Sequence, residues 1–206
     1  MSNVFAQQER QELCLLFDEV GPEAPTLCEG WLSDDLAAHL WLRETDPIVA
    51  VGIMLKPLAG VARWRMEACK AKHSYPELVE MVRRGPARFS PFALPGVDEQ
   101  ANTLEYFIHH EDLRRGVDPQ AQPRVLPSAM DDWLWKRVGG MGMMLRGKQS
   151  HGVIVQRSGG LGVGNQHVRL RPGVPITTLI GEPGELLLWL YGRRAHAHIT
   201  QVGPQL

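Results

Sequence analysis

Two side chains in the middle of the chain are spaced so that they could hold one divalent metal ion. Glu105 and His109 lie four residues apart in a segment with apolar residues at helical spacing. Since a helix advances about 100° per residue, four steps bring the two side chains within roughly 40° of each other, so both can reach one ion. His110 falls about 140° from Glu105 on the same helix. The spacing therefore predicts that Glu105 and His109, and not His110, face a common ion.

His39 is the predicted third ligand. It shares a helical stripe with Leu36 and Leu42, so we expect it to face the core and not the solvent. Two neutral imidazoles and one carboxylate suit Zn²⁺, Ni²⁺ or Fe²⁺, and three protein ligands leave positions open for water or substrate, as in catalytic sites. The alternative is two unrelated core histidines and a glutamate that only forms a salt bridge.

Two aspartates are candidates to orient the histidine rings. Asp112 follows His109 by three residues, and Asp35 precedes His39 by four. Each carboxylate could accept the second ring N–H of its histidine, which is a common arrangement around metal ligands. Solvated surface carboxylates are the alternative.

The composition limits the classes of partner. The 206 residues carry 22 Lys and Arg against 23 Asp and Glu, with no run of five like charges, which argues against a nucleic-acid or membrane-surface partner. No apolar stretch approaches the roughly 20 residues of a bilayer crossing, and the N-terminus has no signal-peptide pattern, so we expect a soluble, cytoplasmic protein. The cysteines, Cys14, Cys28 and Cys69, form no C-x-x-C pattern and are expected to be free, mostly buried thiols.

Helical patterns fill the first half of the chain. Ser33 and Ser74 are expected as N-caps, because a side-chain oxygen there can accept a backbone N–H of the first turn. Several helical patterns within about 115 residues predict an antiparallel bundle. The apolar periodicity and the Pro and Gly stop signals predict helices over residues 8–20, 34–44, 58–72, 75–84 and 98–116.

The second half differs in composition. Proline-rich residues 118–127 are expected to link two domains, over residues 1–118 and 127–206. Ser128 and Asp131 resemble a capping box at the start of a helix. The expected fold class is α+β, with an N-terminal helical bundle and a small C-terminal α/β domain. Alternating segments predict strands over residues 152–158, 167–171, 176–180 and 195–202, with a helix over residues 185–191.

Two further motifs are weaker candidates for a functional site. Glycine-rich residues 159–165 lie between two strand patterns with no helix after them, so they predict a hairpin connection and not a phosphate loop. His196 and His198 fall on one face of the last predicted strand. Because no third candidate ligand is near them in the sequence, an exposed strand face is favoured over a metal site.

Three segments together resemble a known family. They are residues 27–31 (LCEGW), 35–40 (DLAAHL) and 102–115 (NTLEYFIHHEDLRR). With this joint spacing, nearly the whole chain resembles the actinobacterial DinB-like, maleylpyruvate-isomerase-like metal-binding proteins. The resemblance implies a DinB-type four-helix bundle followed by a small α/β domain. It also implies a zinc ion held by His39, Glu105 and His109.

The function that the resemblance implies is a metal-dependent, mycothiol-dependent isomerase or thiol S-transferase acting on a small electrophilic substrate. Such a protein has a low-molecular-weight thiol as its partner and needs none of its own cysteines. Residues 186–193 (LLLWLYGR) resemble the family's Leu-rich helix that ends in Gly-Arg, which implies that Arg193 could bind a substrate or cofactor carboxylate. An arginine that only complements the helix dipole is the alternative. The second hypothesis is a non-catalytic metal-binding or thiol-sensing protein.

Overall fold

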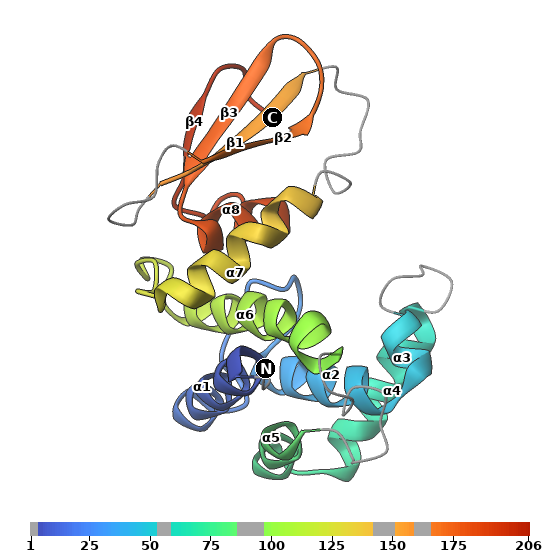
Figure 1. The fold of residues 1–206 in the computed structure, drawn as a ribbon. Helices are drawn as coiled ribbons and strands as arrows, with labels where there is room; N and C mark the ends of the chain where they lie inside the picture. Colours follow the sequence, from blue (N-terminus) through green and yellow to red (C-terminus); the bar gives the residue numbers. More distant parts are fainter. Residues whose placement is uncertain (1–3, 53–58, 86–96, 142–150, 159–165) are drawn as a thin grey trace. The chain divides into compact units, whose positions relative to one another are not determined.

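The protein divides into two compact units, Met1–Pro119 and Gln120–Leu206. The boundary therefore falls inside the segment predicted to be a linker. The described part of the chain forms helices in both units and one four-stranded sheet (Figure 1), which agrees with the expected α+β class. In that part, no helix is both long enough and apolar enough to span a membrane. The computed structural model describes residues 4–52, 59–85, 97–141, 151–158 and 166–206.

Unit 1 is helical, and most of its helices begin and end close to the predicted residues. Helix α5 has the expected N-cap, since Ser74 donates its backbone N–H to Glu77 Oε2 at 2.8 Å. Helix α3 is not predicted by the sequence analysis. Pro47 has no N–H with which to continue α2, and Asp46 Oδ1 accepts the N–H of Ile48 at 2.9 Å, so a new helix begins there. The helices are α1 (Val4–Val20), α2 (Ser33–Thr45), α3 (Pro47–Gly52), α4 (Ala59–Lys72), α5 (Tyr75–Arg84) and α6 (Val97–Val117).

Helix α2 begins one residue earlier than predicted, so Ser33 is its first residue and not its N-cap. The N-cap is Leu32, whose backbone N–H donates to Asp35 Oδ2 at 2.9 Å. Ser33 is fully buried, and its hydroxyl forms a hydrogen bond of 2.6 Å with the Tyr75 hydroxyl. A tertiary contact with α5 therefore replaces the capping role expected from the sequence.

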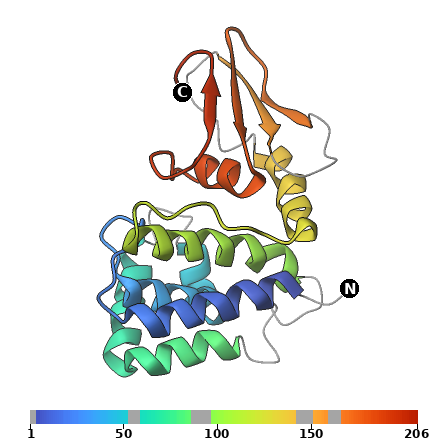
Figure 2. The same cartoon turned by 90° about the vertical axis from the view of Figure 1, so that its left-hand side faces the viewer.

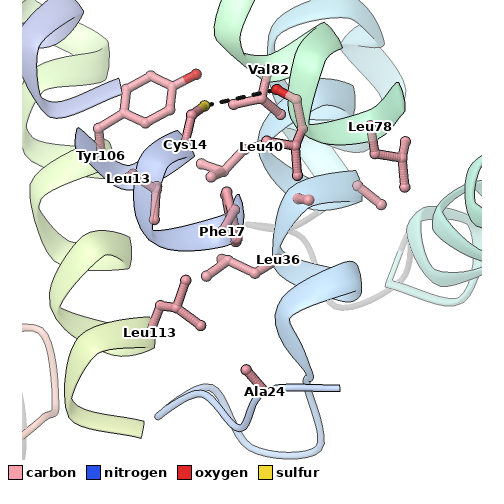
Figure 3. Packing of buried hydrophobic residues seen from close by; sticks show 13 residues of the cluster. Leu13, Cys14, Phe17, Ala24, Leu36, Leu40, Leu78, Val82, Tyr106 and Leu113 are labelled. Atoms are coloured by element: carbon pink, nitrogen blue, oxygen red, sulfur yellow. Dashed lines mark hydrogen bonds between the residues drawn. The ribbon is translucent and has the colours of Figure 1, made fainter. Parts of the chain in front are cut away.

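Helices α1, α2, α5 and α6 share one hydrophobic core (Figure 3). Leu13, Phe17, Leu36, Leu78 and Leu113 are each exposed by 1% or less. Burial of one such side chain contributes about 1.5–3 kcal/mol. Figure 2 shows α1 between α6 and α5, in agreement with the contacts of α1 with both helices.

A buried ion pair crosses the same unit. Arg10 of α1 donates from Nη1 and Nη2 to the two carboxylate oxygens of Glu44 on α2, at 2.9 and 2.7 Å. From α6, Asn102 Nδ2 and Tyr106 Oη donate to Glu44 Oε1 at 2.8 and 2.9 Å. Buried charges are strongly destabilising unless they are paired and hydrogen-bonded, so these bonds constrain how α1, α2 and α6 pack.

Unit 2 is a small sheet with two helices. The sheet has the order β2-β1-β3-β4, in which β1 and β3 are parallel and each outer strand is antiparallel to its neighbour. Val153 pairs with Thr177 and Val155 with Leu179, and all four are fully buried. Helix α8 packs against β3, and α7 packs against α8. The elements are α7 (Ser128–Val138), β1 (Gly152–Arg157), β2 (His167–Arg171), β3 (Ile176–Gly181), α8 (Pro183–Leu190) and β4 (Thr200–Val202).

Two sequence predictions for unit 2 are wrong. Strand β4 is shorter than predicted, so His196 and His198 precede it and share no strand face; the His198 backbone N–H donates to Glu185 Oε2 at 2.7 Å. Asp131 caps no helix, because its carboxylate accepts a 2.6 Å hydrogen bond from Arg157. Residues 159–165 lie outside the described residues, while the strands that flank them, β1 and β2, are antiparallel neighbours.

The three cysteines are free, as the sequence predicts. Cys14 is fully buried, its thiol donates to the Val79 carbonyl at 3.8 Å (Figure 3), and burial raises its pKa to about 12. Cys28 and Cys69 are half-buried. Cys14 is therefore a core residue with little thiolate character at neutral pH.

The ion pair between α1 and α2 generates a first prediction. Glu44→Ala leaves the buried Arg10 guanidinium without its carboxylate and should lower the free energy of unfolding by about 3–5 kcal/mol. Urea denaturation followed by circular dichroism measures this change. Glu19→Ala, at an exposed position of α1, is the control and should change stability by about 0.5 kcal/mol or less. Equal denaturation midpoints for the two variants would contradict the assigned role of the pair.

Candidate metal centre

Helices α2 and α6 bring the three predicted ligands together. His39 Nε2 lies 3.4 Å from Glu105 Oε1, and His109 Nε2 lies 3.3 Å from the same oxygen. The three potential ligand atoms all lie within 4.8 Å of one another. Both histidines are buried, and the Glu105 side chain is 26% exposed. Two imidazole nitrogens thus converge on one carboxylate oxygen at the edge of the solvent.

Asp112 orients the ring of His109. Its Oδ2 lies 2.9 Å from His109 Nδ1, and the Asp112 side chain is fully buried. A carboxylate at this distance favours the proton on Nδ1, so the Nε2 atom that faces Glu105 is left as the nitrogen able to bind a metal. This agrees with the partner predicted from the three-residue spacing.

The prediction that Asp35 accepts the second ring N–H of His39 is wrong. Asp35 Oδ2 accepts the Leu32 N–H at the start of α2, and Oδ1 pairs with Lys70. His39 Nδ1 is buried and has no hydrogen-bond partner among the described residues. The ring of His39 instead packs against that of Trp31, with centroids 4.9 Å apart. The four-residue spacing places Asp35 in the first turn of α2, where an open backbone N–H competes for its carboxylate.

Arg43 contributes a positive charge to the centre. It lies one helical turn after His39 on α2, and its Nε is 3.3 Å from Glu105 Oε1. Its Nη1 donates to Asn102 Oδ1 on α6. Glu105 is therefore held by groups from both helices, and its carboxylate orientation depends on Arg43 as well as on the histidines.

The two histidines have opposite pKa shifts. Burial lowers the pKa of His39, and its hydrogen bond to Glu105 opposes this only in part. Burial also acts to lower the pKa of His109, but hydrogen bonds with Asp112, Cys28 and Glu105 raise it well above its usual value. Burial acts to raise the pKa of Glu105, yet hydrogen bonds from His109 and His39 hold it well below the usual range. Without a metal, one positive ring and one neutral ring face an ionised carboxylate.

Cys28 lies beside the centre, which the sequence analysis does not predict. Its thiol donates to Asp112 Oδ2 at 3.2 Å and lies 3.9 Å from His109 Nδ1. The preceding residue anchors this loop, because the Leu27 N–H donates to the Asp112 carbonyl at 3.0 Å. The only sequence signal for this position is that Cys28 belongs to the LCEGW segment of the family resemblance.

A close backbone approach holds the loop in place. A Cβ atom on Gly116 of α6 would lie 2.3 Å from the Pro25 carbonyl oxygen, so only glycine allows the loop to approach the helix there. Thr26 Oγ1 accepts the Cys28 N–H at 3.1 Å. These contacts place Cys28 next to Asp112 and Trp31 next to His39, although the loop is far from α6 in the sequence.

A cavity of about 500 Å³ borders the same loop. Trp31, Ala62 and Met66 give it an apolar side, and Asp35 and Glu67 are among its charged residues. Since Trp31 also packs on His39, one aromatic side chain contacts both the cavity and the centre. The volume falls within the usual range for small-molecule sites.

Arg193 belongs to unit 2 and is half-buried just beyond the end of α8. Its Nη1 donates to the Tyr191 carbonyl at 2.7 Å, and its backbone N–H donates to the Leu188 carbonyl at 2.9 Å. These bonds match the alternative reading of an arginine at a helix C-terminus. Its predicted role in carboxylate binding stays a prediction.

Comparisons with known proteins assign no family to this chain: no family model, curated protein or solved structure matches it. The resemblance described above thus rests on the residues quoted for it.

The opposite pKa shifts of the two histidines generate a second prediction. In chelator-treated protein near pH 6.5, the usual pKa of histidine, the His109 ring should be protonated and the His39 ring neutral. Side-chain ¹⁵N chemical shifts during a pH titration measure both states. Asp112→Asn should lower the pKa of His109, because an amide no longer stabilises the charged ring.

Asp18→Asn, at an exposed position of α1, is the matched control and should leave both titrations unchanged. If His39 and His109 lose their protons at the same pH in the unsubstituted protein, the assigned electrostatics are wrong.

Proposed function

We propose that unit 1 binds one divalent metal ion through His39, Glu105 and His109, with zinc favoured over nickel. The supporting observation is the convergence of two imidazole Nε2 atoms on one Glu105 oxygen, with ligand atoms within 4.8 Å of one another. Two nitrogens and one carboxylate are a common ligand set for zinc. The arrangement also has the hydrogen-bonded carboxylate, Asp112, that typically orients a ligating histidine.

The protonation states of the ligands fit this proposal. His39 is held neutral by burial, which is the form that binds metals. The proton that His109 carries without a metal is stabilised by Glu105 and Asp112. A divalent ion would replace this proton as the positive charge between Glu105 and His109.

The activity that we propose is a mycothiol-dependent isomerase or thiol S-transferase acting on a small electrophilic substrate. A bound zinc ion favours the thiolate form of a sulfur ligand and so supplies a nucleophile at neutral pH. For a substrate with an electron-poor cis double bond, thiolate addition, rotation about the new single bond and thiolate elimination would give the trans isomer and regenerate the thiolate.

The chain's own residues supply the surroundings for this reaction. Trp31 and the cavity that it lines offer an apolar surface for a small substrate next to His39. Arg43 contacts Glu105 and adds a positive charge beside this proposed ligand. Arg193, on the basis of the family resemblance, is proposed to bind a substrate or cofactor carboxylate.

A non-catalytic role is the second candidate function. The proposed ligands come from α2 and α6, and Asp112 also holds the loop that carries Cys28. An ion bound there would tie these segments together, which favours a stabilising or thiol-sensing role. The two candidates differ in what metal removal does to the fold.

Metal removal therefore provides a third prediction. If the protein is an enzyme, chelation should abolish turnover of a cis-enoyl acid with mycothiol while circular dichroism stays unchanged, and one equivalent of zinc should restore turnover. A structural role predicts loss of the helical signal together with the metal. Retention of full turnover without metal would contradict the proposed chemistry.

A fourth prediction separates the two adjacent histidines. His109→Ala removes one of three ligands and should weaken zinc affinity by at least the roughly 10- to 100-fold that loss of an outer-shell partner causes. His110→Ala should keep this ion, because its ring lies toward Glu9 on α1. Zinc titrations at fixed pH, with up to one equivalent of metal, measure both affinities. Loss of the ion in His110→Ala but not in His109→Ala would contradict the assigned ligand set.

A further inference from the structure

A second group of potential ligands lies on another face of α6. His110 Nδ1 is 3.3 Å from Glu9 Oε2 of α1, and Glu12 lies one turn further along α1. The potential ligand atoms of Glu9, Glu12 and His110 all lie within 4.8 Å of one another. None of these residues belongs to the centre formed by His39, Glu105 and His109.

Helix geometry explains why the two groups are separate. His110 follows His109 directly, and one residue corresponds to about 100° around the helix axis. The ring of His109 therefore points toward α2, while that of His110 points toward α1. On α1, Glu9 and Glu12 are three residues apart, which places both carboxylates on the face that meets α6.

Burial and charge favour a cation in this group. Glu9 is 1% exposed and His110 is 6% exposed, while Glu12 is half-buried. Two carboxylates this close to each other repel, and burial strengthens the repulsion because the local dielectric is low. A divalent cation bound to both carboxylates would lower this repulsion in addition to the partners that they already have, such as Gln8 and His110. Gln8 Nε2 donates to Glu12 Oε1 at 2.9 Å and orients that carboxylate.

We propose that Glu9, Glu12 and His110 form a second divalent-cation site between α1 and α6. Two carboxylates and one imidazole make a harder ligand set than the two imidazoles and one carboxylate of the first centre. The second site should therefore bind Zn²⁺ more weakly than the first and should accept Mn²⁺. This inference shares no ligand with the proposed function and does not rest on it.

The test uses the full chain, stripped of metal and then dialysed against excess Mn²⁺ or Zn²⁺. In the His109→Ala background, which lacks a ligand of the first centre, one ion per chain should still bind. Adding Glu12→Gln removes one of three ligands and should weaken that binding by at least the roughly tenfold that loss of an outer-shell partner causes. Glu19→Gln, on the exposed face of α1, is the matched control and should leave the affinity unchanged.

The spectrum of bound Mn²⁺ shows whether His110 is a ligand of the ion. Electron spin-echo measurements on Mn²⁺ in the His109→Ala protein should show coupling to an imidazole ¹⁴N, and adding His110→Gln should remove it. Unchanged affinity in Glu12→Gln, or ¹⁴N coupling that persists without His110, would overturn the second site. His39→Ala is added to His109→Ala in both measurements, which removes the remaining imidazole of the first centre, so neither result depends on whether that centre binds metal.

Discussion

The constraint on which unit 1 depends is the burial of polar side chains on several sides of α6 between Asn102 and Arg115. Asn102, Glu111, Asp112 and Arg115 of this helix are each exposed by 2% or less, and neighbouring positions carry buried histidines. A buried polar group without a partner is costly, so each neighbouring element must present a matching group. Helix α1 presents Glu9, α2 presents Glu44 and Arg43, and the loop before α2 presents Cys28 and the Leu27 N–H.

These pairings connect the core to the candidate metal centre. Glu44 binds Arg10 and Asn102, Asn102 accepts a hydrogen bond from Arg43, and Arg43 contacts Glu105. The network thus runs from the buried α1–α2 ion pair to a proposed ligand at the edge of the solvent. The same hydrogen bonds stabilise the packing of α2 on α6 and orient Glu105. Loss of one bond in such a network therefore affects the other members.

Local sequence signals predict helix bounds and the pairings of side chains within one helix. They do not predict the contacts that a loop makes with a helix. The bounds of α5 and the pairings of His109 with Glu105 and Asp112 follow from Ser74, Gly85 and helical spacing alone. The contacts of Cys28 and Trp31 depend on how closely the preceding loop approaches α6 at Gly116, and no periodicity encodes that approach. Spacing alone also predicts wrong roles for Asp35 and for the histidines before β4. The Asp35 carboxylate accepts the Leu32 N–H instead of a histidine ring N–H. His198 precedes β4, and its backbone N–H donates to Glu185.

The difference between the two histidines of the centre shows how the surroundings of a ligand set its proton chemistry. The rings of His39 and His109 have centroids only 5.0 Å apart, and both are buried. Only His109 has a fully buried carboxylate, Asp112, on its far nitrogen, so only its pKa is raised. A metal ion that binds both Nε2 atoms at neutral pH would therefore displace a proton from His109 and none from His39. Its apparent affinity would rise with pH until the pKa of His109 is passed, because below that pH each binding event must also remove the proton.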